Sequence, residues 1–180
     1  MRDEMTRGTE IGKEAQSWTS QGKLFPDDLA LKIVWSWIGE HTRFILDGFP
    51  RTLPQAQAFD AGLAERELPL DRVYFLDLPD DIIVERVMGR LTCAQCGAVY
   101  NSTFHRLTES DPCPKCHGHL ERRSDDTPET LAQRLAEFRE LTYPVVEYYR
   151  ASGVLLEVDA IIGRDKIFTI LHADMKYNRV

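Results

Sequence analysis

Four cysteines, arranged as two Cys-x-x-Cys pairs, constrain the fold of this chain more than any other feature. The pairs are Cys93 with Cys96 and Cys113 with Cys116, separated by 16 residues. Two such knuckles can bring four thiolates around one tetrahedral ion, and Zn²⁺ is the usual occupant of an all-cysteine site. A lobe of about 35 residues buries too little apolar surface to fold on its own, so a metal would supply the missing folding free energy. We therefore expect a structural zinc site formed by these four residues.

Three other interpretations of the cysteines stay open, although each fits less well. The run Cys113-Pro-Lys-Cys116-His117 also matches a haem-attachment pattern, but the upstream pair and the lack of an export signal argue against haem. A nucleic-acid-binding zinc ribbon would need no α/β domain around it. A redox pair is a weaker alternative, since all four cysteines lie in one lobe. The nearby histidines are expected at the surface, with replacement of a cysteine ligand as the lesser alternative: His105, His117 and His119.

Composition narrows the class of partner. The 180 residues carry 22 Lys+Arg against 29 Asp+Glu, a net charge of -7. This acidity argues against a general nucleic-acid binder, which usually presents a basic face. No apolar run approaches the roughly 18 residues of a membrane span, and the first four residues lack the apolar region of a secretory signal. We expect a cytoplasmic protein with neither nucleic acid nor membrane as a partner.

The rest of the chain shows an alternating pattern of strands and helices. Three short apolar runs are expected as buried strands: residues 44–46, 72–78 and 154–158. Helices are expected over residues 2–21, from Pro26, over 79–90, and from Thr127 to a kink or end at Pro144. Strands that alternate with helices predict an α/β protein whose parallel sheet is flanked by helices.

Arginines lie near both ends of the cysteine lobe. Arg86 and Arg90 are four residues apart on one expected helix and would share a face. Arg123 and Arg134 follow the lobe. One interpretation is solvated surface charge, as for most arginines. The other is a cation cluster for phosphates, because phosphoryl transfer depends mainly on positioning and charge stabilisation.

Asp47 ends the first expected strand. Ligands of open α/β sheets gather at the carboxyl ends of the strands, and a carboxylate there could hold Mg²⁺ directly or through water. The alternative is a simple turn acid before Gly48.

Five segments together resemble the adenylate kinases, in the correct order and over nearly the whole chain. They are Gly22–Asp27, Leu46–Thr52 with Gln55, Glu85–Arg90, Cys93–Cys116, and Arg122–Asp126 with Arg134. The cysteine segment resembles the zinc lid of the long bacterial form. The resemblance implies a P-loop-kinase-like α/β fold with an inserted lid. It also implies a monomer that converts ATP and AMP reversibly to two ADP with Mg²⁺.

The resemblance further implies three regions and a set of site residues. Residues 1–26 would be the remainder of the lobe that binds the nucleoside monophosphate, 27–90 and 127–180 the core, and 91–126 the zinc lid. Gln55 would read the adenine edge, since an amide can pair bidentately with adenine. AMP would contact Arg2, Lys23, Leu24, Phe25, Gly48, Arg51, Gln55, Arg123 and Arg134. ATP would contact Arg86, Arg90, Val99, Tyr100 and Ile162, and catalysis would rest on Arg86, Arg123, Arg134 and Asp47.

Two departures from the family pattern stand out. Asp159 is followed by Ala160 where the family has Asp-Gly, which affects the adenine contact expected near Ile162. The 180 residues also contain no G-x-x-x-x-G-K-[ST] phosphate-binding loop. We expect a chain truncated at its N-terminus, without the first core strand and this loop, so that its activity as given is in question. The alternative is a noncatalytic zinc protein of this fold that binds a nucleotide or a partner. The identity of the acceptor beyond AMP stays open.

Overall fold

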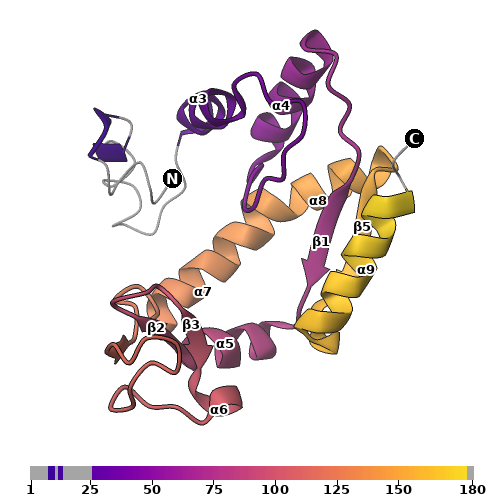
Figure 1. Cartoon of the computed structure of the whole chain (residues 1–180). Helices are drawn as coiled ribbons and strands as arrows, with labels where there is room; N and C mark the ends of the chain where they lie inside the picture. Colours follow the sequence, from indigo (N-terminus) through magenta and orange to yellow (C-terminus); the bar gives the residue numbers. More distant parts are fainter. Residues whose placement is uncertain (1–7, 11, 14–25, 178–180) are drawn as a thin grey trace. The chain divides into compact units, whose positions relative to one another are not determined.

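The computed structural model describes residues 8–10, 12–13 and 26–177. Four expected AMP contacts, Arg2, Lys23, Leu24 and Phe25, lie outside the described residues, as does most of the helix expected over 2–21. The chain divides into two compact units (Figure 1): Met1–Asp77 with Ala136–Val180, and Leu78–Leu135. Across the described ranges, no helix has both the length and the apolar character needed to cross a membrane.

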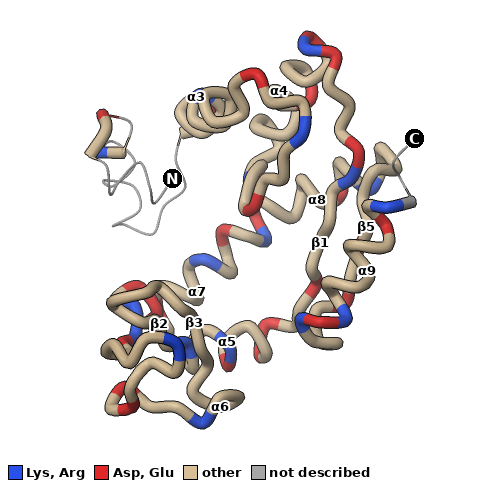
Figure 2. Tube along the Cα trace, viewed as in Figure 1, with Lys and Arg blue, Asp and Glu red and all other residues tan. Residues whose placement is uncertain are grey.

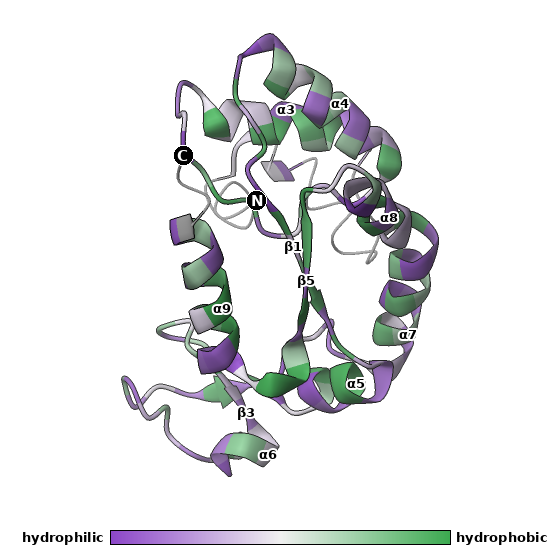
Figure 3. Ribbon diagram, turned by 90° about the vertical axis from the view of Figure 1, so that its right-hand side faces the viewer, coloured by the Kyte–Doolittle hydropathy of each residue, from purple (hydrophilic) through white to green (hydrophobic). Residues whose placement is uncertain are grey.

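A parallel pair of strands forms the sheet of the first unit, as expected. β1 (Val73–Asp77) pairs with β5 (Leu155–Asp159) in register from Val73 opposite Leu155 to Asp77 opposite Asp159. Both strands are largely hydrophobic (Figure 3), although each ends in an aspartate. Such strands are typical of a sheet covered by helices.

Helices contact both faces of this sheet. α8 (Tyr143–Ala151) buries Val145 and Tyr149 in a cluster with Val73 of β1. The next residue of the strand, Tyr74, points to the opposite face because strand side chains alternate. There its hydroxyl donates to Asp174 of α9 (Arg164–Tyr177) at 2.8 Å, beside an ion pair from Arg72 to the same carboxylate. The predicted α/β fold with a helix-flanked parallel sheet is confirmed.

A second core in this unit lies between α3 (Asp27–Ile38) and α4 (Leu53–Glu65). Pro26 precedes α3 as expected, and two acidic residues occupy its first turn, where they favour the positive helix end. Phe59 of α4 is 2% exposed and lies among aromatic rings, with ring centroids 5.0–6.3 Å away. Gly62 leaves room for the indole of Trp35, since a Cβ there would lie 2.5 Å from that ring.

The expected strand over residues 44–46 is wrong. Phe44 and Leu46 pack against the Phe59 core, while Ile45 between them is 74% exposed. The segment thus has the alternating side chains of a strand, but among the described residues the parallel sheet contains only β1 and β5. Burial on a helix pair, rather than backbone pairing, explains this apolar run.

The second unit contains a small antiparallel sheet. Its strands are β2 (Arg90–Cys93), β3 (Val99–Asn101) and β4 (Leu120–Glu121), with β2 in the middle. α5 (Asp80–Met88) precedes the sheet, α6 (Ser102–His105) follows β3, and α7 (Pro128–Glu137) begins after β4. The cysteine segment is therefore built around a small three-stranded sheet.

Arg86 and Arg90 do not share a helix, so that expectation is wrong. α5 ends at Met88, and Arg90 pairs with Asn101 in the β2–β3 ladder. The side chain of Asn101 donates to the carbonyl oxygen of Arg86 at 3.2 Å. A Cβ at Gly89 would lie 2.7 Å from the same amide, so only glycine fits between helix and strand. Strand pairing therefore ends the helix two residues earlier than its apolar pattern suggests.

The helix from residue 127 is interrupted before Pro144, as expected. α7 ends at Glu137, and a π-helical stretch, η1 (Phe138–Thr142), leads into α8. Pro144 lies in the first turn of α8, where a missing N–H is tolerated. It has no N–H for the carbonyl oxygen of Glu140, four residues earlier. A π stretch before such a residue is a common way for a helix to absorb the irregularity.

Candidate functional site

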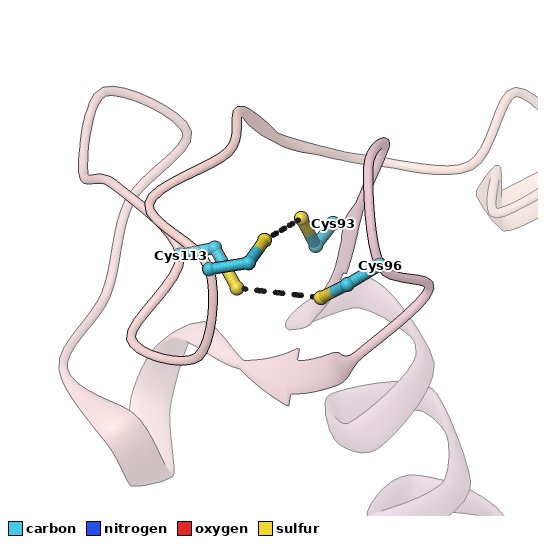
Figure 4. Close-up of side chains that lie close together, drawn as sticks. Cys93, Cys96 and Cys113 are labelled. Atoms are coloured by element: carbon cyan, nitrogen blue, oxygen red, sulfur yellow. Dashed lines mark hydrogen bonds between the residues drawn. The ribbon is translucent and has the colours of Figure 1, made fainter.

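The two cysteine pairs meet in the second unit. The sulfur of Cys93 lies 3.5 Å from that of Cys116, and the sulfur of Cys96 lies 3.7 Å from that of Cys113 (Figure 4). All four sulfurs lie within 4.8 Å of one another, and all four cysteines are free thiols rather than disulfides. A tetrahedron with metal–sulfur bonds of about 2.3 Å has edges of about 3.8 Å. The four residues therefore fit a tetrahedral metal ion.

Both knuckles use the same backbone design. The N–H of Gly97 donates to the carbonyl oxygen of Cys93 at 2.9 Å, and the N–H of His117 donates to that of Cys113 at 2.8 Å. Gly97 and His117 both have positive φ, 69° and 61°. The fold thus closes each pair into an equivalent tight turn. Within the described residues, the cluster of metal-ligating side chains consists of the four cysteines alone, and the three nearby histidines are exposed as expected.

Hydrogen bonds favour the thiolate at one cysteine of each pair. The backbone N–H of Cys96 lowers the pKa of Cys93. Burial alone would raise the pKa of Cys113, but hydrogen bonds from the Tyr100 hydroxyl and from backbone N–H groups lower it to about 6. At Cys116, a hydrogen bond from the backbone N–H of Gly118 is outweighed by the neighbouring sulfurs, which raise the pKa to about 12. Four adjacent thiolates therefore need a cation to share their charge.

Two of the arginines expected at the lobe ends, Arg90 and Arg134, are paired with acids in this unit. Arg90 donates through Nε and Nη2 to both oxygens of Asp126, each at 2.8 Å, and the Asp126 side chain is only 3% exposed. Arg134 bonds Asp125 at 2.6 Å and lies 4.0 Å from Asp126. Red and blue segments are accordingly interspersed along this unit (Figure 2). Two adjacent carboxylates thus set the positions of two of the expected phosphate contacts.

The other expected contacts of the second unit lie on its helix and strands. Arg86 is on α5, and Arg123 donates to the hydroxyl of Thr92 at 3.3 Å. Val99 and Tyr100 are on β3, with Val99 52% exposed. The Tyr100 hydroxyl lies 3.4 Å from the sulfur of Cys113, and this hydrogen bond raises the pKa of Tyr100 to about 12. Tyr100, an expected ATP contact, therefore also contacts the candidate metal site.

In the first unit, the loop before α4 holds Arg51 by three bonds. Its Nε donates to the carbonyl oxygen of Gly48 at 2.7 Å, and its backbone N–H donates to Oε1 of Gln55 at 2.8 Å. The hydroxyl of Thr142 donates to the carbonyl oxygen of Arg51 at 2.8 Å. Gly48 has a φ of 72°, and a Cβ there would lie 2.9 Å from the Arg51 guanidinium. The positive φ at 48 favours glycine for the turn, and the Arg51 guanidinium approaches it closely.

Within the described part of this unit, Gln55 is the most buried of the expected site residues, with 2% exposure. Its Nε2 donates to Oδ1 of Asp27 at 2.9 Å, and its backbone N–H caps α4 through the hydroxyl of Thr52. That hydroxyl donates to the same Asp27 oxygen at 2.8 Å. In the sequence, Asp27 appeared only as the last residue of the family-like segment Gly22–Asp27, with no role of its own. Asp27 bonds to residues 25 and 28 positions away. No local sequence pattern could have predicted these bonds.

Asp47 and Ile162 occupy turns. Asp47 is exposed in the loop before Gly48, so its expected place at a strand end is wrong, because residues 44–46 form no strand. Ile162 closes the short 3₁₀ turn η2 (Ala160–Ile162) after β5. The Asp159 carboxylate accepts from the N–H of Ile161 at 2.8 Å, and Ala160 is buried. This turn is therefore formed with alanine at 160.

Comparison with known proteins agrees with these observations. The family model described as adenylate kinase matches residues 1–154. An adenylate kinase of Syntrophomonas wolfei is 39% identical over 170 residues, covering 93% of this chain and 79% of the relative. Those of Archaeoglobus fulgidus and Thermodesulfovibrio yellowstonii are 39% and 38% identical, covering 88% and 96% of this chain and 75% and 82% of the relatives. The chain belongs to the adenylate kinase family.

Proposed function

We propose that this chain takes part in reversible phosphoryl transfer from ATP to AMP, giving two ADP, with the loop around Arg51 as its AMP site. The arrangement of Arg51 carries the proposal. Three hydrogen bonds fix its backbone and Nε, while neither Nη group has a hydrogen-bond partner among the residues that the structure describes. A guanidinium held in advance loses little conformational freedom when it binds a phosphate, and its planar fork suits phosphate oxygens.

The adenine of AMP would lie against Gln55. Oε1 already accepts one hydrogen bond and Nε2 donates one. The amide keeps a second N–H and a second lone pair. These are the groups that a bidentate contact to adenine uses. Residues expected to complete the AMP site are Gly48, Arg2, Lys23, Leu24, Phe25, Arg123 and Arg134.

The second unit would bind ATP and stabilise the charge of the transferred phosphoryl group. Arg90 uses two of its five N–H donors for Asp126, which leaves Nη1 for a phosphate. Arg86, Arg123 and Arg134 would also contact phosphates, Val99 and Tyr100 would contact ATP, and Ile162 would lie near its adenine. Mg²⁺, when bound with ATP, neutralises phosphate charge. Asp47 is exposed and would hold the water shell of that ion.

Zn²⁺ is the metal proposed for the four cysteines. An all-sulfur tetrahedral site fits zinc or an iron–sulfur centre, and the sulfur spacing of 3.5–3.7 Å matches the edges of a single-ion tetrahedron. Bound zinc would supply folding free energy to the lobe over residues 91–126. Metal analysis would separate the two cases, since an iron–sulfur centre would bring iron, acid-labile sulfide and visible colour.

We further propose that the protein works as a cytoplasmic monomer, because thiol ligands persist in a reducing compartment. Light scattering during gel filtration tests the monomer. A mass of twice 20.7 kDa or more would contradict it.

The first experiment is a coupled assay of ADP formation with ATP, AMP and Mg²⁺. It compares the 180-residue chain with the same chain extended at its N-terminus by the phosphate-binding segment of a family member. The proposal expects turnover in the extended protein, and expects Arg51→Ala to reduce it by about 100-fold or more, as loss of a charge-stabilising contact does. Arg66→Ala is a matched control, because Arg66 stacks on Trp35 instead. An extended protein that folds, binds zinc and still transfers no phosphate would overturn the proposal.

A further inference from the structure

We infer that Asp27 is a positioning residue for AMP, setting the orientation of Gln55 and, through it, of Arg51. The inference rests on the proposed AMP site. One oxygen of Asp27 accepts two hydrogen bonds, from Thr52 at 2.8 Å and from Nε2 of Gln55 at 2.9 Å. Both donors lie at the start of α4, whereas Asp27 begins α3. The carboxylate therefore joins the two helices where the AMP loop enters α4.

The chemistry of the partners fixes which way the Gln55 amide faces. A carboxylate only accepts, so the side of Gln55 toward Asp27 must be Nε2. A backbone N–H only donates, so the side toward Arg51 must be Oε1. With the amide 2% exposed, a reversed orientation would leave two buried mismatches, which is costly. The same oxygen also orders the Thr52 hydroxyl, whose lone pair then accepts the backbone N–H of Gln55.

Amide orientation decides which base can bind. Adenine presents N7 as an acceptor and its amino group as a donor, so it needs one N–H and one oxygen from a pairing amide. Guanine presents two acceptors at N7 and O6. An amide fixed by Asp27 and Arg51 offers one donor and one acceptor in a set order. Asp27 thus contributes to the preference for AMP over GMP without touching either nucleotide.

The next residue provides a matched control. Asp28 also lies in the first turn of α3, so it contributes a similar charge to the helix end. Its side chain is 74% exposed and approaches Lys32 at 3.8 Å. Asp28→Ala therefore reproduces the loss of charge and helix-end stabilisation, but leaves the bonds to Thr52 and Gln55 intact.

The test measures KM and Kd for AMP and GMP, and KM for ATP, in Asp27→Ala, Asp27→Asn and Asp28→Ala of the extended protein. We expect Asp27→Ala to weaken AMP binding by about tenfold, to lower the AMP-over-GMP preference, and to leave KM for ATP unchanged. Asp27→Asn, whose carbonyl oxygen still accepts both bonds, should recover most of the affinity. If Asp27→Ala does not fold, the comparison of Asp27→Asn with Asp28→Ala decides instead. We then expect Asp27→Asn to lose a small part of the AMP-over-GMP preference and Asp28→Ala to lose none.

Hydrogen exchange gives a readout that does not depend on turnover. The backbone amides of Arg51 and Gln55 should exchange faster in Asp27→Ala than in Asp28→Ala. Equal AMP affinity and base preference in the two alanine variants would overturn the positioning role while leaving the proposed function intact. Failure of the unsubstituted protein to bind AMP at all would overturn both.

Discussion

The cysteine lobe and the α3–α4 pair both carry expected nucleotide contacts, yet different forces hold them together. The lobe has four fully buried core residues, of which two are cysteines of the proposed zinc site: Leu91, Cys93, Cys113 and Leu120. The α3–α4 pair buries Ile38, Phe59 and Leu63 beneath a group of aromatic rings. We therefore expect one region to depend on the proposed metal coordination and the other on apolar burial. The difference teaches that the two should fail under different treatments.

Loss of one metal ligand should have the largest effect. Cys113→Ser is expected to release the metal and unfold the lobe, since structural zinc contributes about 10–16 kcal/mol in zinc-finger peptides. The α3–α4 pair should survive. All three tryptophans, Trp18, Trp35 and Trp37, lie in residues 1–77, so their fluorescence reports on the first unit alone. Cys113→Ser should therefore lose its metal while its tryptophan fluorescence stays that of the folded first unit. A simultaneous loss of both would mean that the two regions do not fold independently.

Truncation of the aromatic core should produce the opposite pattern. Phe59→Ala is expected to destabilise the first unit by about 3–5 kcal/mol, because a fully buried ring leaves a cavity. Phe59→Leu, which keeps most of the volume, should cost less. Urea denaturation followed by tryptophan fluorescence measures both, and metal analysis of the native protein should give the same zinc content as before. Loss of zinc in Phe59→Ala would contradict the separation.

Removal of the buried acid of the second unit should have an intermediate effect. Asp126→Ala leaves Arg90 without its two bonds, which we expect to cost about 2–3 kcal/mol. Hydrogen exchange of the β2 amides, with the exposed Glu129 changed to Ala as control, would detect the loss. Unchanged exchange in Asp126→Ala would mean that the pair contributes little to the lobe.

The smallest effect should come from Asp125 and should depend on pH. Burial alone would raise its pKa, but the ion pair and hydrogen bond with Arg134 lower it below the usual value. A carboxyl group with a lowered folded pKa adds stability above its unfolded pKa of about 3.9 and loses that stability as pH falls. Since both side chains are more than a third exposed, the contribution is expected to stay under about 1 kcal/mol and to weaken in salt. Asp125→Asn should abolish this pH dependence in the thermal denaturation of the second unit, and persistence of the dependence would assign it elsewhere.

Local signals in the sequence predicted the parts of the fold that local forces create. The knuckles follow from the Cys-x-x-Cys spacing, and β1 and β5 follow from short apolar runs. Residues 44–46 have the same apolar composition as such a strand, but their side chains pack against the α3–α4 pair instead. Composition alone could not distinguish the two cases. Arg90 was misplaced because the pairing of β2 with β3 determines where α5 ends, and pairing is a long-range property.

The candidate site divides in the same way. Cysteine ligands, Gly48, Arg51 and Gln55 lie in motifs that the sequence displays. Asp27 bonds to residues that lie 25 and 28 positions further along the chain, and Thr142 bonds to a residue 91 positions before it. No spacing rule connects residues so far apart. Side-chain networks between elements appear only once the chain is folded.

The π-helical stretch η1 determines how the helix before α8 responds to the loss of a residue. A residue in an α-helix turns the chain by about 100°, and π winding accommodates one residue more per hydrogen-bonded turn than α winding does. Deletion of one residue between 138 and 142 would therefore allow regular α winding while leaving α8 in about the same rotation against the sheet. Deletion of Glu147, within the regular helix α8, would instead rotate Tyr149 by about 100° relative to Val145, out of the core that the two residues share. Along this helix the number of residues, more than their identity, carries the structural information.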